Sequence, residues 1–302
     1  MSTAPRGQVY DIGYRRYEGA REGRARARTA VYKDGLRTAM GIGRGGRAKI
    51  LPWMFIGAMV ATGLIMALLA GAADRVAGQG TSEQLDLPSH SDFYGIASIM
   101  LFLFASTVGP ELLCADRRSG VLSLYLVRPL TGTDYAAARW LSFLTIMTAV
   151  AWLPQAVLLA GLALGAPDTA GYFKDNWLDI PRFLGAGLAI SVYTTGLALM
   201  VASFTTRRAY AAASLVGLFV VSTPVTTGAA ESLGGTLGQW VAMFNLSNIP
   251  VHVNDIIFGE PSDVTRQSLA RGLPEYVRVL WWAGWTIGPA AVLWRRYRRL
   301  SP

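Results

Sequence analysis

Long runs of uncharged, mostly apolar residues alternate with short polar segments along the 302-residue chain. Six of these runs approach the length of about 20 residues that a helix needs to cross a bilayer. They cover about residues 50–73, 93–113, 138–167, 182–206, 209–230 and 277–295. Arg278 and Arg295 flank the last and shortest run, and they can extend it by placing their charges at the membrane surface. The pattern predicts an all-α integral membrane protein with six transmembrane helices.

A further uncharged segment, residues 232–254, is interrupted by glycines, asparagines and a proline. Lipid-exposed backbone does not tolerate such interruptions, whereas a re-entrant or surface-lying pair of half-helices does. Counting this segment as a span would also place the basic residues 295–299 on the opposite side of the membrane from the basic N-terminus. We therefore expect half-helices on the outer side, between the fifth and sixth spans.

Basic residues are concentrated on one side of this predicted arrangement. Residues 1–49, the second–third connection, the fourth–fifth connection and the C-terminus together hold 22 of the 28 Lys and Arg residues. Because cytoplasmic loops are enriched in Lys and Arg, both termini are predicted to be cytoplasmic. The composition, 52% hydrophobic and 16% charged, also differs from that of an ordinary soluble domain. Topology explains the basic N-terminus, so nucleic-acid binding is not expected.

The basic N-terminal segment, residues 1–49, contains apolar side chains at helical spacing between residues 29 and 40. This spacing predicts a cytoplasmic helix lying at the membrane interface, and a solvated basic tail is the alternative. The residues assigned to the interfacial helix are Tyr32, Lys33, Leu36, Arg37 and Met40. The single transmembrane domain then occupies residues 50–302.

A charged, turn-rich block connects the second and third spans. Acidic and basic residues precede Gly120, and an apolar stretch of about ten residues, too short to cross a bilayer, follows it as far as Pro129. Such an element buries its apolar side at the membrane surface or in a groove of a partner. We expect a force-receiving coupling helix at about residues 114–130, with an ordinary surface loop as the alternative. The candidate coupling residues are Glu111, Asp116, Arg117, Arg118, Gly120, Leu122, Tyr125, Arg128 and Pro129.

Glu111 has two interpretations, a functional carboxylate at membrane depth or an interfacial group paired with a nearby arginine. Small and hydroxyl-bearing residues are frequent in the fourth and fifth spans, where they let helices approach closely. Helix packing is their commoner role, and a polar pathway is the alternative. The residues concerned, with one glutamine of the third span, are Gln155, Thr194, Thr195, Ser222 and Thr226.

Residues suited to catalysis or ion coupling are sparse. The single cysteine excludes an internal disulfide, and the two histidines are too far apart to suggest a metal site. Residues 41–46 match GxGxxG without a preceding strand, so we interpret them as a hinge, and no lysine lies in a GxxxxGK[ST] loop.

A membrane-embedded lipid-modifying enzyme would depend on His252, Asn254 and Asp255, which have no evident nucleophile. The interiors of the third to fifth spans lack ionisable residues, which argues against an ATP-independent secondary transporter or channel.

The second–third connection resembles the signature of ABC-2-type transporter permeases. The similarity lies in Asp116-Arg117-Arg118-Ser119-Gly120-Val121-Leu122, then Leu124 and Leu126, then Arg128-Pro129-Leu130. The family often has Glu at the position of Asp116 and Lys at that of Arg139, and both differences preserve the charge. The six-span layout, the interfacial helix and the half-helices are similar too.

This resemblance implies a permease subunit in a bacterial plasma membrane that exports a small amphipathic, drug-like, lipid or glycan cargo. It implies two kinds of partner, a second permease (the same chain or a paralogue) and cytoplasmic ABC ATPase subunits, besides membrane lipids. ATP and Mg would bind the ATPase, so this chain would not itself be an enzyme and would hold no cofactor or metal.

Overall fold

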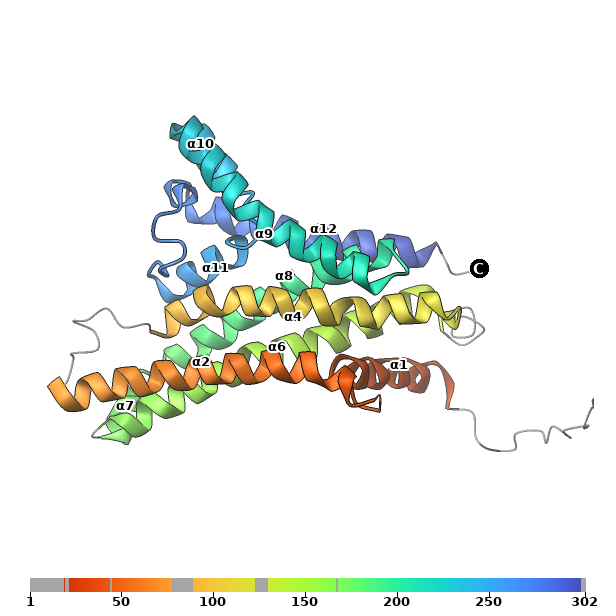
Figure 1. Ribbon diagram of the computed structural model, residues 1–302, viewed down its shortest axis with the longest axis horizontal. Coiled ribbons are helices and arrows are strands. Elements are labelled where there is room, and N and C mark those ends of the chain that lie inside the picture. The colour runs from red at the N-terminus through yellow and green to blue at the C-terminus, as the bar shows by residue number, and fades with distance from the viewer. Residues whose placement is uncertain are drawn as a thin grey trace, which may run out of the picture.

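The computed structural model describes residue 19 and residues 22–43, 45–77, 89–122, 130–166 and 168–299, and this part of the chain is all-helical, without a strand. The elements are α1 (Gly23–Ala39), α2 (Arg47–Ala77), α4 (His90–Arg118), α6 (Gly132–Gly165), α7 (Thr169–Asp175), α8 (Asp179–Phe204), α9 (Arg208–Leu233), α10 (Gly235–Ala242), α11 (Ile249–Phe258), the 3-10 turn η1 (Leu269–Gly272) and α12 (Glu275–Arg298) (Figure 1). Five helices, α2, α4, α6, α8 and α9, are long and apolar enough to cross a membrane. These helices identify a multi-pass membrane protein.

Each predicted span coincides with one helix, although the bounds differ by several residues. The helix at the sixth predicted span, α12, has 24 residues but is less apolar than the other five. It is not among the helices that are apolar enough to cross a membrane. Its basic last turn contains Arg295, Arg296 and Arg298, and these charges make it less apolar than the other long helices.

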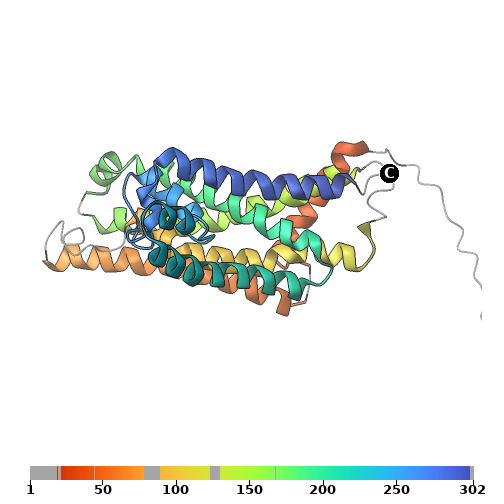
Figure 2. The same ribbon diagram turned by 90° about the horizontal axis from the view of Figure 1, so that it is seen from above.

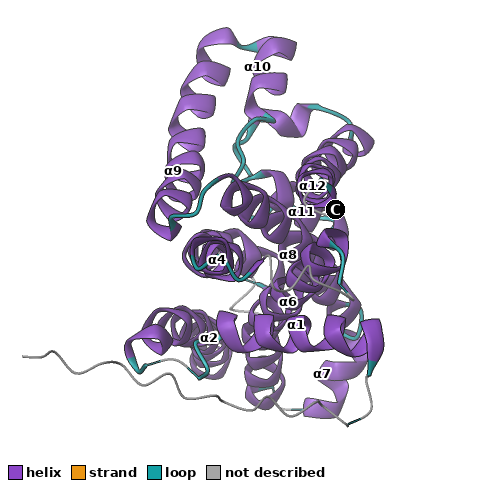
Figure 3. Ribbon diagram, turned by 90° about the vertical axis from the view of Figure 1, so that its right-hand side faces the viewer, coloured by secondary structure: helices purple, strands orange, loops and turns teal. Residues whose placement is uncertain are grey.

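The long helices lie side by side, and α4, α6 and α8 form the centre of the bundle (Figures 1 and 2). About two thirds of the most apolar stretch of α4 and of α8 is buried (67% each), against 28% for α2 and 22% for α9. Viewed from one end, α4 lies between α2 and α9 (Figure 3). The outer helices therefore present long apolar faces that suit contact with lipid or another protein.

At one end of the bundle, which we call the α1 end, α1 lies across the other helices and contacts α6 and α4 (Figure 3). The close approach requires Gly35, because a Cβ there would collide with the side chain of Ser142 on α6. A turn links α1 to α2, and Gly41 and Gly43 adopt positive φ angles of 66° and 82° in it. The described residues of the predicted hinge, 41–43 and 45–46, thus form the turn between α1, which lies across the bundle, and α2, which runs along it (Figure 3).

The opposite end, which we call the α11 end, contains the short helices expected between the fifth and sixth spans. Gly234 and Gly235, with φ of 59° and 51°, form the sharp turn between α9 and α10, which lean away from the bundle (Figure 1). Helix α11 packs instead against α8, α12 and α4.

The expected coupling helix differs from the structure at its start. Residues 114–118 belong to the last turns of α4, and Ser119 and Gly120 form the turn that follows, with a φ of 70° at Gly120. Tyr125, Arg128 and Pro129 lie outside the described residues.

Candidate functional site

Arg139, in the second turn of α6, is buried where α1, α4 and α6 meet, with 2% of its surface exposed. Its Nη2 atom lies 2.5 Å from Oδ2 of Asp116 on α4 and 2.8 Å from Oδ2 of Asp34 on α1. A buried guanidinium is tolerated only when it is paired, because desolvation of an isolated charge costs several kcal/mol. The two carboxylates therefore fix α1 and the end of α4 against α6.

Asp116 has a second donor in the same junction. The Tyr135 hydroxyl donates to Oδ2 of Asp116 over 2.7 Å, and the Arg139 guanidinium lies over the Tyr135 ring, 5.5 Å from its centroid. The Tyr135 ring also packs against Tyr297, near the end of α12, with 5.5 Å between centroids. The junction thus includes the C-terminal turn of α12.

The first half of α1 is held separately, at the N-terminus of α6. Thr131 and Asp134 form a capping box there, in which each side chain accepts a backbone N–H of the other residue. Asp134 also pairs with Arg24 and Arg28 of α1, each over 2.7 Å. Sequence analysis missed these contacts, although the Thr-x-x-Asp spacing before the third span is a recognisable helix start.

The end of α4 is also tied to the α8–α9 connection. Nη1 of Arg117 donates to the backbone oxygens of Ser203 and, over 3.3 Å, Thr205. Glu111 forms an ion pair with Arg208, the first residue of α9. Glu111 is thus paired with an arginine, as the interfacial interpretation expects.

The remaining candidate coupling residues lie on the surface or beside the core. Arg118 is exposed and makes no hydrogen bond or ion pair within the described part of the chain. Gly120 is exposed at the turn, and Leu122 is half-buried and packs against the core. An exposed arginine thus projects beside a rigid junction.

Helix α1 has the two-sided character that its sequence predicted. Tyr32 and Met40 pack against the core, Leu36 is half-buried, and the Tyr32 hydroxyl lies 3.0 Å from that of Thr145. Lys33 and Arg37 are exposed. The apolar face therefore lies on α6 and α4, and the basic face remains free to contact a surface or a partner.

A polar pocket of about 370 Å³ opens at the junction, and we call it the junction pocket. Its polar lining includes Asp34, Arg37, Glu111, Asp116 and Arg139. Carboxylates and guanidinium groups neutralise each other there, and the lining also includes Thr38. No group of His, Cys, Asp and Glu within the described residues could hold a metal ion. The ion pairs around this pocket join α1, α4 and α6.

The candidate packing or pathway residues are mostly bonded within their own helices. Thr194 donates to the Ile190 oxygen over 2.7 Å, Thr226 to that of Ser222 over 2.6 Å, and Ser222 to that of Phe219 over 3.0 Å. Thr195 is fully buried.

Gln155 instead joins two helices, α6 and α4. Its Oε1 lies 2.6 Å from Nδ1 of His90, and its Nε2 donates to the His90 oxygen over 3.0 Å. Gln155 therefore forms a polar contact between two helices, of the kind that stabilises helix packing in membranes.

At the α11 end, a buried polar cluster joins α11 and the following loop to the start of α4. Asp255 accepts hydrogen bonds from the Thr265 hydroxyl and, over 3.1 Å, from the Ser262 N–H. Asn254 donates to the Ser91 oxygen over 2.9 Å.

His252 is 1% exposed, and its Nδ1 lies 4.0 Å from Asp255. Burial, assisted by Arg278 and Arg271, lowers the pKa of His252 to about 3, while burial raises the pKa of Asp255. His252 is therefore neutral at physiological pH and enclosed by protein.

Comparison of the sequence with protein-family models found no match, and comparison with curated proteins found none either.

Proposed function

We propose that this chain is the transmembrane permease subunit of an ATP-driven exporter, driven by a separate cytoplasmic ATPase. The observation that supports this most directly is the position of Arg139 between Asp34 and Asp116. It joins the amphipathic helix α1 to the end of α4 and the start of α6, the two elements that flank the proposed coupling segment. A push on this segment or on α1 would then move these helices together.

The contacts around the junction extend the same path to the remaining helices. Arg117 connects the end of α4 to the end of α8, Glu111 connects α4 to the start of α9, and Tyr135 connects α6 to α12. Rigid, packed elements of this kind transmit displacement because they do not deform continuously. ATP binding and hydrolysis, with Mg, would take place on the partner, and this chain would supply no catalytic group.

The arrangement of the helices is compatible with the proposed topology. The start of α1 and the end of α12 both lie at the α1 end (Figures 1 and 2), as expected if α12 is the sixth span. The α1 end would face the cytoplasm of a bacterial cell, because Arg and Lys residues are concentrated there. A second permease, either an identical chain or a paralogue, would complete the transporter. Its cargo would be the small amphipathic, drug-like, lipid or glycan compound that the resemblance implies.

The test is purification of the tagged chain from its native membrane in mild detergent, followed by identification of co-purifying subunits and an ATPase assay. Arg118→Ala removes an exposed charge beside the junction, and Asp116→Ala loosens the junction itself. Arg271→Ala, at the α11 end, is the matched control for the arginine substitution. We expect an ATPase subunit to co-purify, its retention or activity to fall in the first two variants, and the control to behave as wild type.

A chain that purifies alone and transports in proteoliposomes without ATP would overturn the proposal in favour of a secondary carrier. Equal effects of Arg118→Ala and Arg271→Ala would disprove the location of the coupling site.

A further inference from the structure

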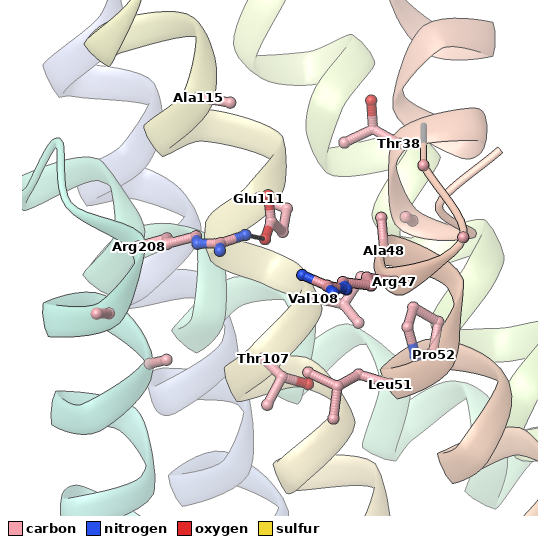
Figure 4. A pocket seen from close by; sticks show the side chains of 15 residues that line it. Thr38, Arg47, Ala48, Leu51, Pro52, Thr107, Val108, Glu111, Ala115 and Arg208 are labelled. Carbon is pink, nitrogen blue, oxygen red and sulfur yellow. Dashed lines mark hydrogen bonds and ion pairs between the residues drawn. The ribbon is translucent and has the colours of Figure 1, made fainter. Parts of the chain in front are cut away.

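A groove of about 930 Å³ separates the first turns of α2 and α9, with α4 as its floor (Figure 4). We call it the α2–α9 groove. Its lining includes charged residues at the mouth and less polar residues below them: Arg47, Leu51, Thr107, Val108, Glu111 and Arg208. It lies at the basic end of the bundle, at the level where α2 and α9 would enter the membrane.

The mouth of the groove carries excess positive charge. Arg47 and Arg208 extend into it from opposite sides, and Glu111 is the only carboxylate among the described residues of its lining (Figure 4). Glu111 is already paired with Arg208, whereas Arg47 makes no hydrogen bond or ion pair to any described residue. Neither α2 nor α9 has an acidic residue in its first turn, so the positive ends of both helix dipoles add to the charge of the arginines.

Below the mouth, the groove becomes apolar and continues along α4. Leu51 is 49% exposed, and Val108 and Thr107 form the floor. The incompletely buried positions of α4 continue as a stripe through Leu103 to Ile99, which is 60% exposed. At 1.5 Å per residue, the stripe from Glu111 to Ile99 is about 18 Å long, close to the hydrocarbon depth of about 15 Å of one leaflet.

We propose that the α2–α9 groove binds an anionic phospholipid of the cytoplasmic leaflet. Its phosphate lies between Arg47 and Arg208, and one acyl chain follows the stripe on α4. The inference rests on the membrane orientation in the proposed function but not on coupling to ATP.

The charge of the groove distinguishes lipid from a second copy of the chain as its occupant. A two-fold-related copy covering the groove would bring the same basic mouth, with Arg47 and Arg208, to the interface, and like charges oppose association. An anionic headgroup neutralises both guanidinium groups, and its chain covers the apolar floor.

The test uses the full-length protein in phosphatidylcholine nanodiscs and measures binding of phosphatidylglycerol carrying a fluorophore on its acyl chain. Arg47→Ala and Arg208→Ala remove the proposed contacts. Lys49→Ala and Arg207→Ala are matched controls, because each removes one positive charge within two residues but lies outside the lining of the groove. Each groove substitution is expected to weaken binding about fivefold, and each control less than twofold.

Four outcomes would overturn the proposal. Equal losses in all four variants would show general attraction to a basic surface, and equal binding of labelled phosphatidylcholine would show that no anionic site exists. Displacement by millimolar inorganic phosphate would indicate a free-anion site. Efficient disulfide cross-linking of two chains through Leu51→Cys, in a Cys114→Ser background and in the presence of lipid, would show a second copy in the groove. The assay contains no ATP or ATPase, so it can fail or succeed independently of the coupling experiment.

Discussion

The guanidinium of Arg139 lies 2.5 Å from the carboxylate of Asp116, and the arginine is almost completely excluded from solvent. Two long helices, α4 and α6, are thereby joined at the end where α1 crosses them. Two further nitrogens of Arg139, Nε and Nη1, have no partner in the structure. The buried charge consequently depends on Asp116 and Asp34, and a change to either side of the pair should be costly.

Replacement of Arg139 tests this dependence. Arg139→Leu leaves the carboxylate of Asp116 without its cation, and we expect a loss of stability of about 3–5 kcal/mol. Adding Asp116→Asn should recover part of the loss, because the amide carries no charge to desolvate. Thermal melting in detergent measures both variants, with the exposed Arg118→Ala as the control. A melting temperature of Arg139→Leu equal to that of Arg118→Ala would contradict a structural role for the pair.

The close approach of α1 to α6 gives a second prediction, at Gly35. A side chain there collides with Ser142, so Gly35→Leu should detach α1 from α6 and let its first half unfold locally, which allows trypsin to cleave after its arginines. Gly57→Leu on α2 is the control, because a Cβ at Gly57 meets nothing within 4 Å. Cleavage after Arg24 and Arg28 should accelerate at least several-fold in Gly35→Leu alone. Unchanged proteolysis would show that α1 docks without the close contact.

The hydrophobic pattern located the long helices because uncharged runs of this length fit only membrane-crossing elements in a chain of this composition. It could not pair Asp34 with Arg139, because these residues are far apart in sequence and their approach depends on the space left by Gly35. Similarly, the sequence could not identify Arg208 as the partner of Glu111, because α9 brings it there from far along the chain. Charges at the helix ends were visible in the sequence, but the tertiary packing that decides their partners was not.

The contact of Gln155 with His90 gives a third prediction. Gln155→Leu leaves both the His90 ring and its backbone oxygen without the amide, deep between α6 and α4. A loss of about 1–2 kcal/mol is expected, the upper range for polar contacts between membrane helices. Thr194→Val is the control, because its hydroxyl bonds only to carbonyls of its own helix. Similar melting temperatures for the two variants would show that Gln155 adds nothing to packing.

The buried His252 makes stability depend on pH in a defined direction. Its pKa in the folded protein, about 3, lies below the ordinary value of 6.5, so only the unfolded chain takes up a proton between these values. Stability from this residue is therefore complete above pH 6.5 and is lost as the pH falls toward 3. Asp255 acts in the opposite direction, because its raised pKa lets the folded state hold a proton that the unfolded chain releases.

Substitution of His252 isolates its share of this pH dependence. His252→Gln cannot titrate, so the difference in melting temperature between wild type and variant should change steadily between pH 6.5 and pH 4. The wild type should lose stability relative to the variant as the pH falls, while Asp255 contributes similarly to both proteins. Melting curves in one detergent across this range provide the measurement, and His90→Gln offers a comparison at a histidine that already has an amide partner. A difference that stays constant with pH would mean that His252 is protonated in the folded protein or exposed to solvent, contrary to its enclosed position on α11.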